Sequence, residues 1–323
     1  MRRRDFIGFL GGAITTWPLA AGAQQTMPVV GFLSSRSPRA ATRFVNAFKQ
    51  GLKEVGFSDG QNISIQYRFA EDQYQRLPAL AAELVGFPVA VIVAGGTVGP
   101  ARQATTAIPI VFTTGFDPVA TGLVSSINHP DGNITGITFY SGALDAKQIE
   151  LLREIAPKSA EIGFLVNPMG SSTEVKINDA RAAAAAVNMK LVVLHASTQH
   201  DLETSFATLA QSPNASMLVS VDPFFDSVPD QFAALAARYR VPTVYTLRDY
   251  VEAGGLISYG ASIVDAYRQA GLYAGQILRG KRVSELPVQF PTKFELAVNL
   301  KSAKALGLDI PPTLLATADA VIE

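Results

Sequence analysis

The sequence predicts an α/β protein of two doubly wound lobes, each with a parallel β-sheet covered by helices on both faces. From residue 27 onward, apolar runs of strand length alternate with segments of helical periodicity, and the same alternation starts again at residue 161. Continuous apolar strands separated by helices are typical of parallel sheets that are buried on both faces. A chain of 323 residues, 48% of them hydrophobic, is long enough for two such domains.

The expected elements follow one another in a regular order. In the first unit we expect strands at 29–33, 63–67, 89–93 and 108–112, and helices at 40–55, 76–84 and 100–106. In the second unit we expect strands at 161–166, 190–194, 217–221 and 243–245, and helices at 172–187, 201–211 and 229–239. A strand at 256–259 and a helix at 263–278 follow, and a tail from 281 holds two short strands and a helix around 302–306.

The trailing elements are what a chain that returns late to its first lobe would need. We assign residues 28–140 with 254–285 to lobe 1, and residues 141–253 with 286–323 to lobe 2. The three hinge segments are expected near 140–145, 252–255 and 284–288.

The first 23 residues are typical of a signal peptide. A basic start, Met1 to Asp5, precedes an apolar stretch at 6–21, and Ala21-Gly22-Ala23 offers a cleavage site before Gln24. The order Arg3-Arg4-Asp5-Phe6-Ile7 fits a twin-arginine export signal. The alternative is a general secretion signal with three chance arginines. Either reading predicts an exported protein.

Charge and cysteine content exclude several classes of function. Removal of Arg2, Arg3, Arg4 and Asp5 with the signal takes the chain from 27 basic and 27 acidic residues to 24 and 26. A nearly neutral chain has no electrostatic reason to bind nucleic acid or an anionic membrane. The absence of cysteine excludes disulfides, thiolate catalysis and a lipid-anchoring Cys. We therefore expect an unlipidated, monomeric periplasmic protein with no inserted segment.

The sequence offers little support for catalysis. It contains neither a G-x-S-x-G elbow nor a G-x-x-x-x-G-K-[ST] phosphate loop, and its three histidines, His129, His195 and His200, lack the spacing of a metal site. We expect no catalytic residue, no metal and no cofactor. A periplasmic enzyme, such as an amidase or isomerase on a similar fold, remains the less favoured alternative.

Polar residues that follow the strands are the candidates for ligand contact, because open α/β sheets bind ligands at their carboxyl edge. The predicted ligand-binding residues are Ser34, Ser35, Thr97, Thr114, Tyr140, Asn167, Asp222 and Tyr245. The first lobe would offer neutral donors and the second an acid, Asp222. This arrangement suits a zwitterion with its carboxylate on the first lobe and its ammonium on the second.

Each candidate also has a structural interpretation. Asp222-Pro223 and Asp117-Pro118 match a helix N-cap followed by proline at the first helical position, and Ser37 and Ser172 are also typical N-caps. The aromatic residues, Tyr245 among them, are as consistent with a core as with a ligand pocket.

Four stretches resemble a known family, the ABC-importer substrate-binding proteins of the tryptophan/tyrosine type. They are "TTGFDPVATGLV" at 113–124, "PDGNITGITFY" at 130–140, "VEAGGLISYG" at 251–260 and "NLKSAKALGLDIPPTLL" at 299–315. Their order along the chain makes the resemblance specific.

The resemblance implies a type I periplasmic-binding fold with three crossover segments, an amino-acid-like or aromatic ligand captured by hinge closure, and an ABC permease with its ATPase as partners. Carried over by position, it implies ligand contacts at Ser34, Thr97, Thr114, Asn167 and Asp222. At Phe139-Tyr140 the chain departs from the small polar pair of the family, so the ligand's identity stays open. A ligand sensor that acts on a membrane receptor fits the same sequence.

Overall fold

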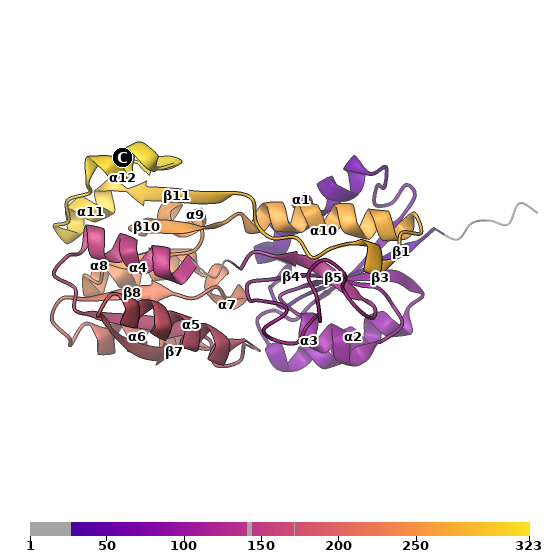
Figure 1. The fold of residues 1–323 in the computed structure, drawn as a ribbon, viewed down its shortest axis with the longest axis horizontal. Helices are drawn as coiled ribbons and strands as arrows, with labels where there is room; N and C mark the ends of the chain where they lie inside the picture. The colour runs from indigo at the N-terminus through magenta and orange to yellow at the C-terminus, as the bar shows by residue number, and fades with distance from the viewer. Residues whose placement is uncertain (1–26, 141–143, 171) are drawn as a thin grey trace, which may run out of the picture.

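The computed structural model describes residues 27–140, 144–170 and 172–323, which form two α/β lobes side by side along the long axis (Figure 1). The two lobes and their parallel sheets confirm the predicted fold class. The predicted signal peptide at 1–23 lies outside the described residues.

The first lobe contains a five-stranded parallel sheet in the order β2-β1-β3-β4-β5. Its strands are β1 (Val29–Ser34), β2 (Ser64–Phe69), β3 (Val89–Gly95), β4 (Ile110–Thr114) and β5 (Ile134–Thr138). Its helices are α1 (Pro38–Glu54), η1 (Tyr74–Arg76), α2 (Leu77–Gly86), α3 (Val98–Ala104), α10 (Ile263–Leu278) and η2 (Val283–Glu285). Helices α1 and α10 lie on one side of the sheet and α2 and α3 on the other (Figure 1).

Helix α10 comes late in the chain, yet it packs against α1 in the first lobe. Glycines make this close approach possible, because a Cβ atom at Gly51 would overlap the carbonyl oxygen of Arg268, and one at Gly271 that of Phe48. The tight contact fixes the returning helix on the first lobe and places its N-terminal residues, Ile263 and Tyr267, at the junction between the lobes.

The second lobe contains a seven-stranded sheet in the order β12-β11-β10-β9-β8-β6-β7. Its strands are β6 (Glu161–Val166), β7 (Lys190–His195), β8 (Ala215–Val219), β9 (Thr243–Tyr245), β10 (Ile257–Ala261), β11 (Phe294–Asn299) and β12 (Ala320–Ile322). Its helices are α4 (Leu144–Ile155), α5 (Thr173–Ala186), α6 (Gln199–Leu209), α7 (Pro223–Asp226), α8 (Pro229–Tyr239), α9 (Arg248–Glu252), α11 (Leu300–Leu306) and α12 (Pro312–Thr317). Strand β11 runs antiparallel to β10, so one edge of this sheet is mixed.

Two of the expected lobe boundaries need correction. Strand β10, expected in lobe 1, pairs with β9 and β11 in the sheet of lobe 2. The Gly254-Gly255 pair makes a turn inside lobe 2, with φ +105° at Gly254, and is not a crossing point. Residues 286–289, expected in lobe 2, lie on lobe 1, where Leu286 O accepts a hydrogen bond from Thr135 Oγ1 at 2.6 Å.

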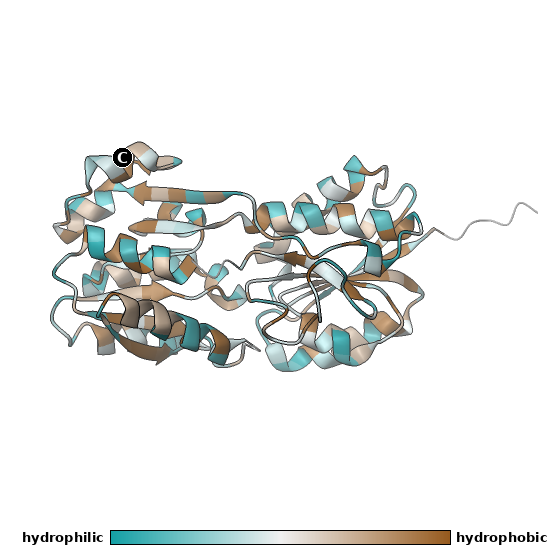
Figure 2. Ribbon diagram, viewed as in Figure 1, coloured by the Kyte–Doolittle hydropathy of each residue, from teal (hydrophilic) through white to brown (hydrophobic). Residues whose placement is uncertain are grey.

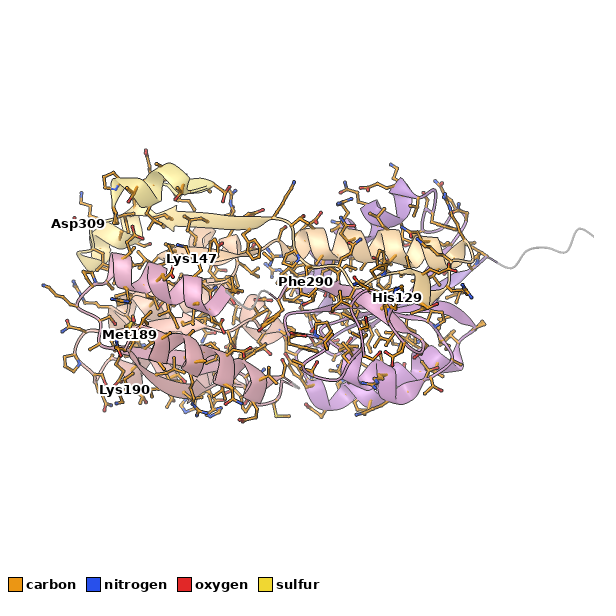
Figure 3. All side chains as sticks on the ribbon, viewed as in Figure 1. His129, Lys147, Met189, Lys190, Phe290 and Asp309 are labelled. Carbon is orange, nitrogen blue, oxygen red and sulfur yellow. The ribbon has the colours of Figure 1, made fainter. Side chains whose placement is uncertain are left out.

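The chain therefore crosses between the lobes after β5, between β10 and α10, and between Gln289 and β11. Phe290, which is exposed, begins the third crossing and lies at the junction of the lobes (Figure 3). The hydrophobic residues are concentrated on the strands of both sheets (Figure 2), and one buried cluster runs from the first lobe into the second.

Candidate functional site

A cavity of about 190 Å³ lies between the lobes, where the carboxyl ends of both sheets meet. An engineered apolar cavity of about 150 Å³ can hold a benzene molecule, so a cavity of this size has room for part of a small organic solute. The first lobe lines it with Arg36, Tyr74, Leu77, Gly96, Gly99, Pro100, Thr113, Thr114, Gly115, Phe116, Phe139, Ile263 and Tyr267. The second lobe contributes Met169, Gly170, Ser172, Lys176, Val221, Asp222 and Pro223.

Asp222 lies in the wall of this cavity, 4% exposed, at the start of α7. Its Oδ1 accepts hydrogen bonds from the backbone N–H of Phe224 at 2.9 Å and from Asn167 Nδ2 at 3.0 Å. The hydroxyl of Tyr74, from the first lobe, donates to Oδ1 at 3.0 Å and lies 3.1 Å from Oδ2. Burial raises the pKa of Asp222, while the bond from Asn167 and the charge of Lys176 oppose that shift.

Asp222 therefore serves as the N-cap of α7, as its structural interpretation expects, and also borders the cavity. The cap uses Oδ1, whereas the only donor within reach of Oδ2 among the described residues is the Tyr74 hydroxyl, whose single proton it shares with Oδ1. A carboxylate oxygen can accept more than one hydrogen bond, so Oδ2 keeps capacity for a ligand donor.

A buried ion pair joins the lobes beside the cavity. Arg36 Nη2, from the loop after β1, lies 2.7 Å from Asp226 Oδ2 at the end of α7, and their side chains are 4% and 0% exposed. Tyr250 OH donates to Asp226 Oδ1 at 3.3 Å, and Arg36 Nη1 donates to Tyr267 OH at 3.3 Å. Because each charge has a partner from the other lobe, this pair forms only when the lobes are together.

Lys176 adds a second positive charge to the cavity wall, from the first turn of α5. Its Nζ donates a hydrogen bond to Val221 O. Burial lowers the pKa of Lys176, while the negative charges of Asp222, Asp145 and Asp226 act in the opposite direction. Within the described residues, no carboxylate oxygen lies within 4.0 Å of this ammonium.

Several buried polar atoms of the first lobe have no hydrogen-bond partner in the described structure. They include Thr113 Oγ1, Ser35 Oγ and Arg36 Nε. Thr113 and Arg36 line the cavity itself. Buried polar groups are nearly always satisfied, so unsatisfied donors at a cavity wall indicate a place for a bound molecule or water.

With this geometry in place, the comparisons with known proteins assign the chain to a family. The sequence profile of the ABC transporter substrate binding protein family matches residues 29–322. This chain belongs to that family. The match confirms the resemblance seen in the sequence.

Individual relatives agree with the family assignment. A tyrosine-binding protein from Clostridioides difficile is 27% identical over 269 residues, which span 81% of this chain and 75% of that protein. A conserved domain protein from Vibrio cholerae superposes with a TM-score of 0.84 at 27% identity, covering 91% of this chain and 99% of that one.

Two further solved structures share the fold of this chain. An ABC domain from Streptococcus pneumoniae in complex with L-Trp gives a TM-score of 0.84 at 21% identity, over 91% of this chain and 99% of that one. A ligand-free, open substrate binding protein with adhesive properties from Clostridium difficile gives 0.64 at 25% identity, with the same coverage.

Of the eight predicted site residues of this substrate-binding protein, Thr114 and Asp222 line the cavity. Asn167 lies directly behind the wall, bonded to Asp222. Ser34, Ser35 and Thr97 are buried in the first lobe, where Ser34 Oγ accepts from Arg36 N at 3.2 Å and Thr97 Oγ1 donates to Leu33 O at 3.1 Å.

Neither of the two tyrosines among the predicted site residues lines this cavity. Tyr140 OH donates to Asp179 at 3.2 Å beside a smaller cavity of about 30 Å³. Tyr245 is 0% exposed in the core of the second lobe, because its ring stacks on Tyr250 with centroids 4.6 Å apart. Tyr245 is therefore a core residue, which is the structural interpretation that the sequence allowed.

Sequence reasoning missed Arg36, Tyr74, Lys176 and Asp226. Arg36 stands in the strand-end loop directly after the predicted Ser34 and Ser35, and Asp226 follows Asp222 by four residues on the same short helix. Both signals were present in the sequence. Tyr74 and Lys176 carry no local signal, because their place at the cavity depends on how the lobes face each other.

The described residues contain no cluster of three or more His, Asp or Glu able to hold a metal ion. Among residues 27–140, 144–170 and 172–323, no helix has the length and hydrophobicity needed to cross a membrane.

Proposed function

We propose that this chain is the solute-binding component of an ABC importer and captures a small amino-acid-like or aromatic solute by closure of its two lobes. The observation that carries the proposal is the cavity between the lobes, which combines a positive and a negative side chain, Lys176 and Asp222, with apolar walls. Ligand pockets are mostly apolar with a few placed polar groups. The tyrosine-binding relative and the L-Trp complex support an aromatic amino acid as the solute.

Closure around the solute is supported by the contacts between the lobes. Besides Arg36–Asp226 and Tyr74–Asp222, Arg43 of α1 pairs with Asp249 of α9. The higher TM-score to the L-Trp complex, compared with the ligand-free open protein, supports a closed arrangement of the lobes here. Hinge closure at crossing segments is a common response of two-lobed binding proteins to a ligand.

The location and partners of this protein follow from the same proposal. We assign the mature chain to the periplasm, with residues 1–23 removed, no lipid anchor, and a permease with its ATPase as receivers of the solute. The signal-like pattern of residues 1–23, the absence of cysteine and the family match support this assignment. We place no catalytic step in the site, since two of the proteins named above, the tyrosine-binding relative and the open substrate binding protein, are binding proteins.

A thermal-shift screen with amino acids, aromatic acids and small amides tests the function. A solute at 100 times its Kd stabilises the folded state by about 2.7 kcal/mol, which raises the melting temperature measurably. We expect the largest shift with L-tyrosine or L-tryptophan. Failure of every solute in the panel to shift the melting temperature would contradict the proposed ligand class.

Binding should also depend on pH, through Asp72 on the first lobe. Asp72 borders Ser227, Arg36, Asp222 and Asp226, and burial together with the two facing carboxylates raises the pKa of Asp72 to about 6. Its Oδ2 accepts a hydrogen bond from Ser227 of the second lobe at 3.4 Å. An acid with a raised pKa binds protons more tightly in the closed form, so closure is favoured as pH falls through 6 and is weakened as pH rises.

We therefore expect solute affinity at pH 5 to exceed that at pH 7.5 by up to about tenfold. Asp72→Asn should reduce this ratio several-fold, because the variant side chain does not titrate. Calorimetric titrations of both proteins at the two pH values measure the effect. An unchanged ratio in Asp72→Asn would rule out Asp72 as its source.

A further inference from the structure

Lys176 occupies a position that helix stability does not explain. It lies in the first turn of α5, which begins at Thr173, and a positive charge near a helix N-terminus is opposed by the helix dipole. So many protein atoms surround its ammonium that burial lowers its pKa. Both effects destabilise the charged side chain, and a bound anion would offset both.

The partners of Lys176 in the structure leave its charge without a close counterion. Its ammonium donates to the carbonyl oxygen of Val221, which bears no full charge. Asp145 and Asp222 act on it only from beyond 4.0 Å among the described residues. Lys176 is partly buried, and charges withdrawn from bulk water are usually paired, so its position at the cavity without a carboxylate in contact indicates that the cavity receives an anion.

The surroundings of Lys176 fit the same role. Gly170 and Ser172, at the start of α5, line the cavity with it, and the Ser172 side chain makes no capping hydrogen bond. Backbone N–H groups at the start of a helix favour an anion in front of them. Lys176 and this helix end therefore act on the same part of the cavity.

We infer that the carboxylate of the solute binds Lys176 at the N-terminus of α5, on the second lobe. The inference rests on the proposed solute-binding function and specifies its ligand chemistry. Asp222, on the same lobe, then faces the ammonium of an α-amino acid, whose two charged groups are neighbours. The apolar side chain of the solute points to Leu77, Phe116 and Phe139 of the first lobe. This reverses the sequence-based expectation that the first lobe holds the carboxylate.

A structural role for Lys176 makes a different prediction. If Lys176 only balances the charges of Asp222, Asp145 and Asp226, its loss should weaken every ligand alike, with or without a carboxylate. The two roles are separated by matched ligands that differ in the carboxylate alone, L-tyrosine against tyramine and L-tryptophan against tryptamine.

We expect wild-type protein to prefer the amino acid to its amine by about 10- to 100-fold, the range for a hydrogen bond to a charged group. Lys176→Met should reduce that preference to about threefold or less, and Lys176→Arg should keep most of it because the positive charge remains. The control is Lys147→Met on α4, an exposed lysine (Figure 3), which should leave the preference unchanged.

These titrations test both the role of Lys176 and the solute-binding function. A preference that persists in Lys176→Met, or equal binding of amine and amino acid by the wild type, would overturn the inference and leave the solute-binding function standing. No binding of any acid or amine by the wild type would overturn both. Melting curves confirm that Lys176→Met is folded, and Lys176→Gln replaces it in the titrations if it is not.

Discussion

Asp222→Asn is expected to weaken solute binding by about two to three orders of magnitude. In the proposed complex the carboxylate faces the solute's ammonium in a closed cavity, and loss of one partner of a buried charge pair costs about 3–5 kcal/mol. The melting temperature of the empty protein should change little, because Asn caps a helix nearly as well as Asp. Calorimetric titration of wild type and variant with the screened solute measures the loss.

Asp222 also accepts the hydrogen bond from Tyr74 of the first lobe. Asp222→Asn could therefore weaken binding by loosening lobe closure as well as by losing the contact with the solute's ammonium, and the two effects must be separated. Tyr74→Phe removes that bond and keeps the carboxylate, and should cost about tenfold, as for one hydrogen bond to a charged group. Asp230→Asn, at an exposed site on α8, is the neutral control. A loss under threefold in Asp222→Asn would contradict its role as the ammonium anchor.

Asp226→Asn is expected to weaken solute binding by about two orders of magnitude or more, although Asp226 is not part of the cavity lining. Closure would bury Arg36 without its counterion, and an unpaired buried charge costs about 3–5 kcal/mol. With the lobes apart, Arg36 faces water, so the free energy of unfolding should change much less. Titration and melting of the same variant measure the two quantities.

A double variant separates the ion pair from other effects of the substitution. Arg36→Met combined with Asp226→Leu leaves no unpaired charge, and replacement of a buried ion pair by apolar residues is often neutral. We expect the double variant to bind the solute more tightly than Asp226→Asn alone. If the losses of binding free energy in the two single variants simply add up in the double variant, Arg36 and Asp226 are not energetically coupled.

Much of the fold could be predicted from the sequence because its signals are local. Apolar strands followed by helices indicated both sheets, and the tail beyond residue 281 contains the expected two strands and helix as β11, β12 and α11. The boundary at Gly254-Gly255 was misplaced, because a glycine pair suits a tight turn within a lobe as well as a hinge. Only the pairing of β10 with β9 and β11 shows that this glycine pair is a turn within lobe 2 and not a hinge.

The candidate site was less accessible to sequence reasoning. Strand-end position identified Thr114 and Asp222, whose place depends on one lobe alone. The pairing of Arg36 with Asp226 and of Tyr74 with Asp222 depends on how the lobes meet, over 190 and 148 residues of sequence separation. Tyr245 follows the same strand-end logic as Thr114, but its side chain points into the core, where it stacks on Tyr250.

Small-angle scattering of the wild type, without and with a saturating amount of the screened solute, tests most directly whether the two lobes close on a ligand held between them. If the lobes close on the solute, the radius of gyration falls when solute is added, as Arg36 meets Asp226 and Tyr74 meets Asp222. Scattering curves that superpose with and without bound solute, while calorimetry confirms saturation, would contradict capture by closure.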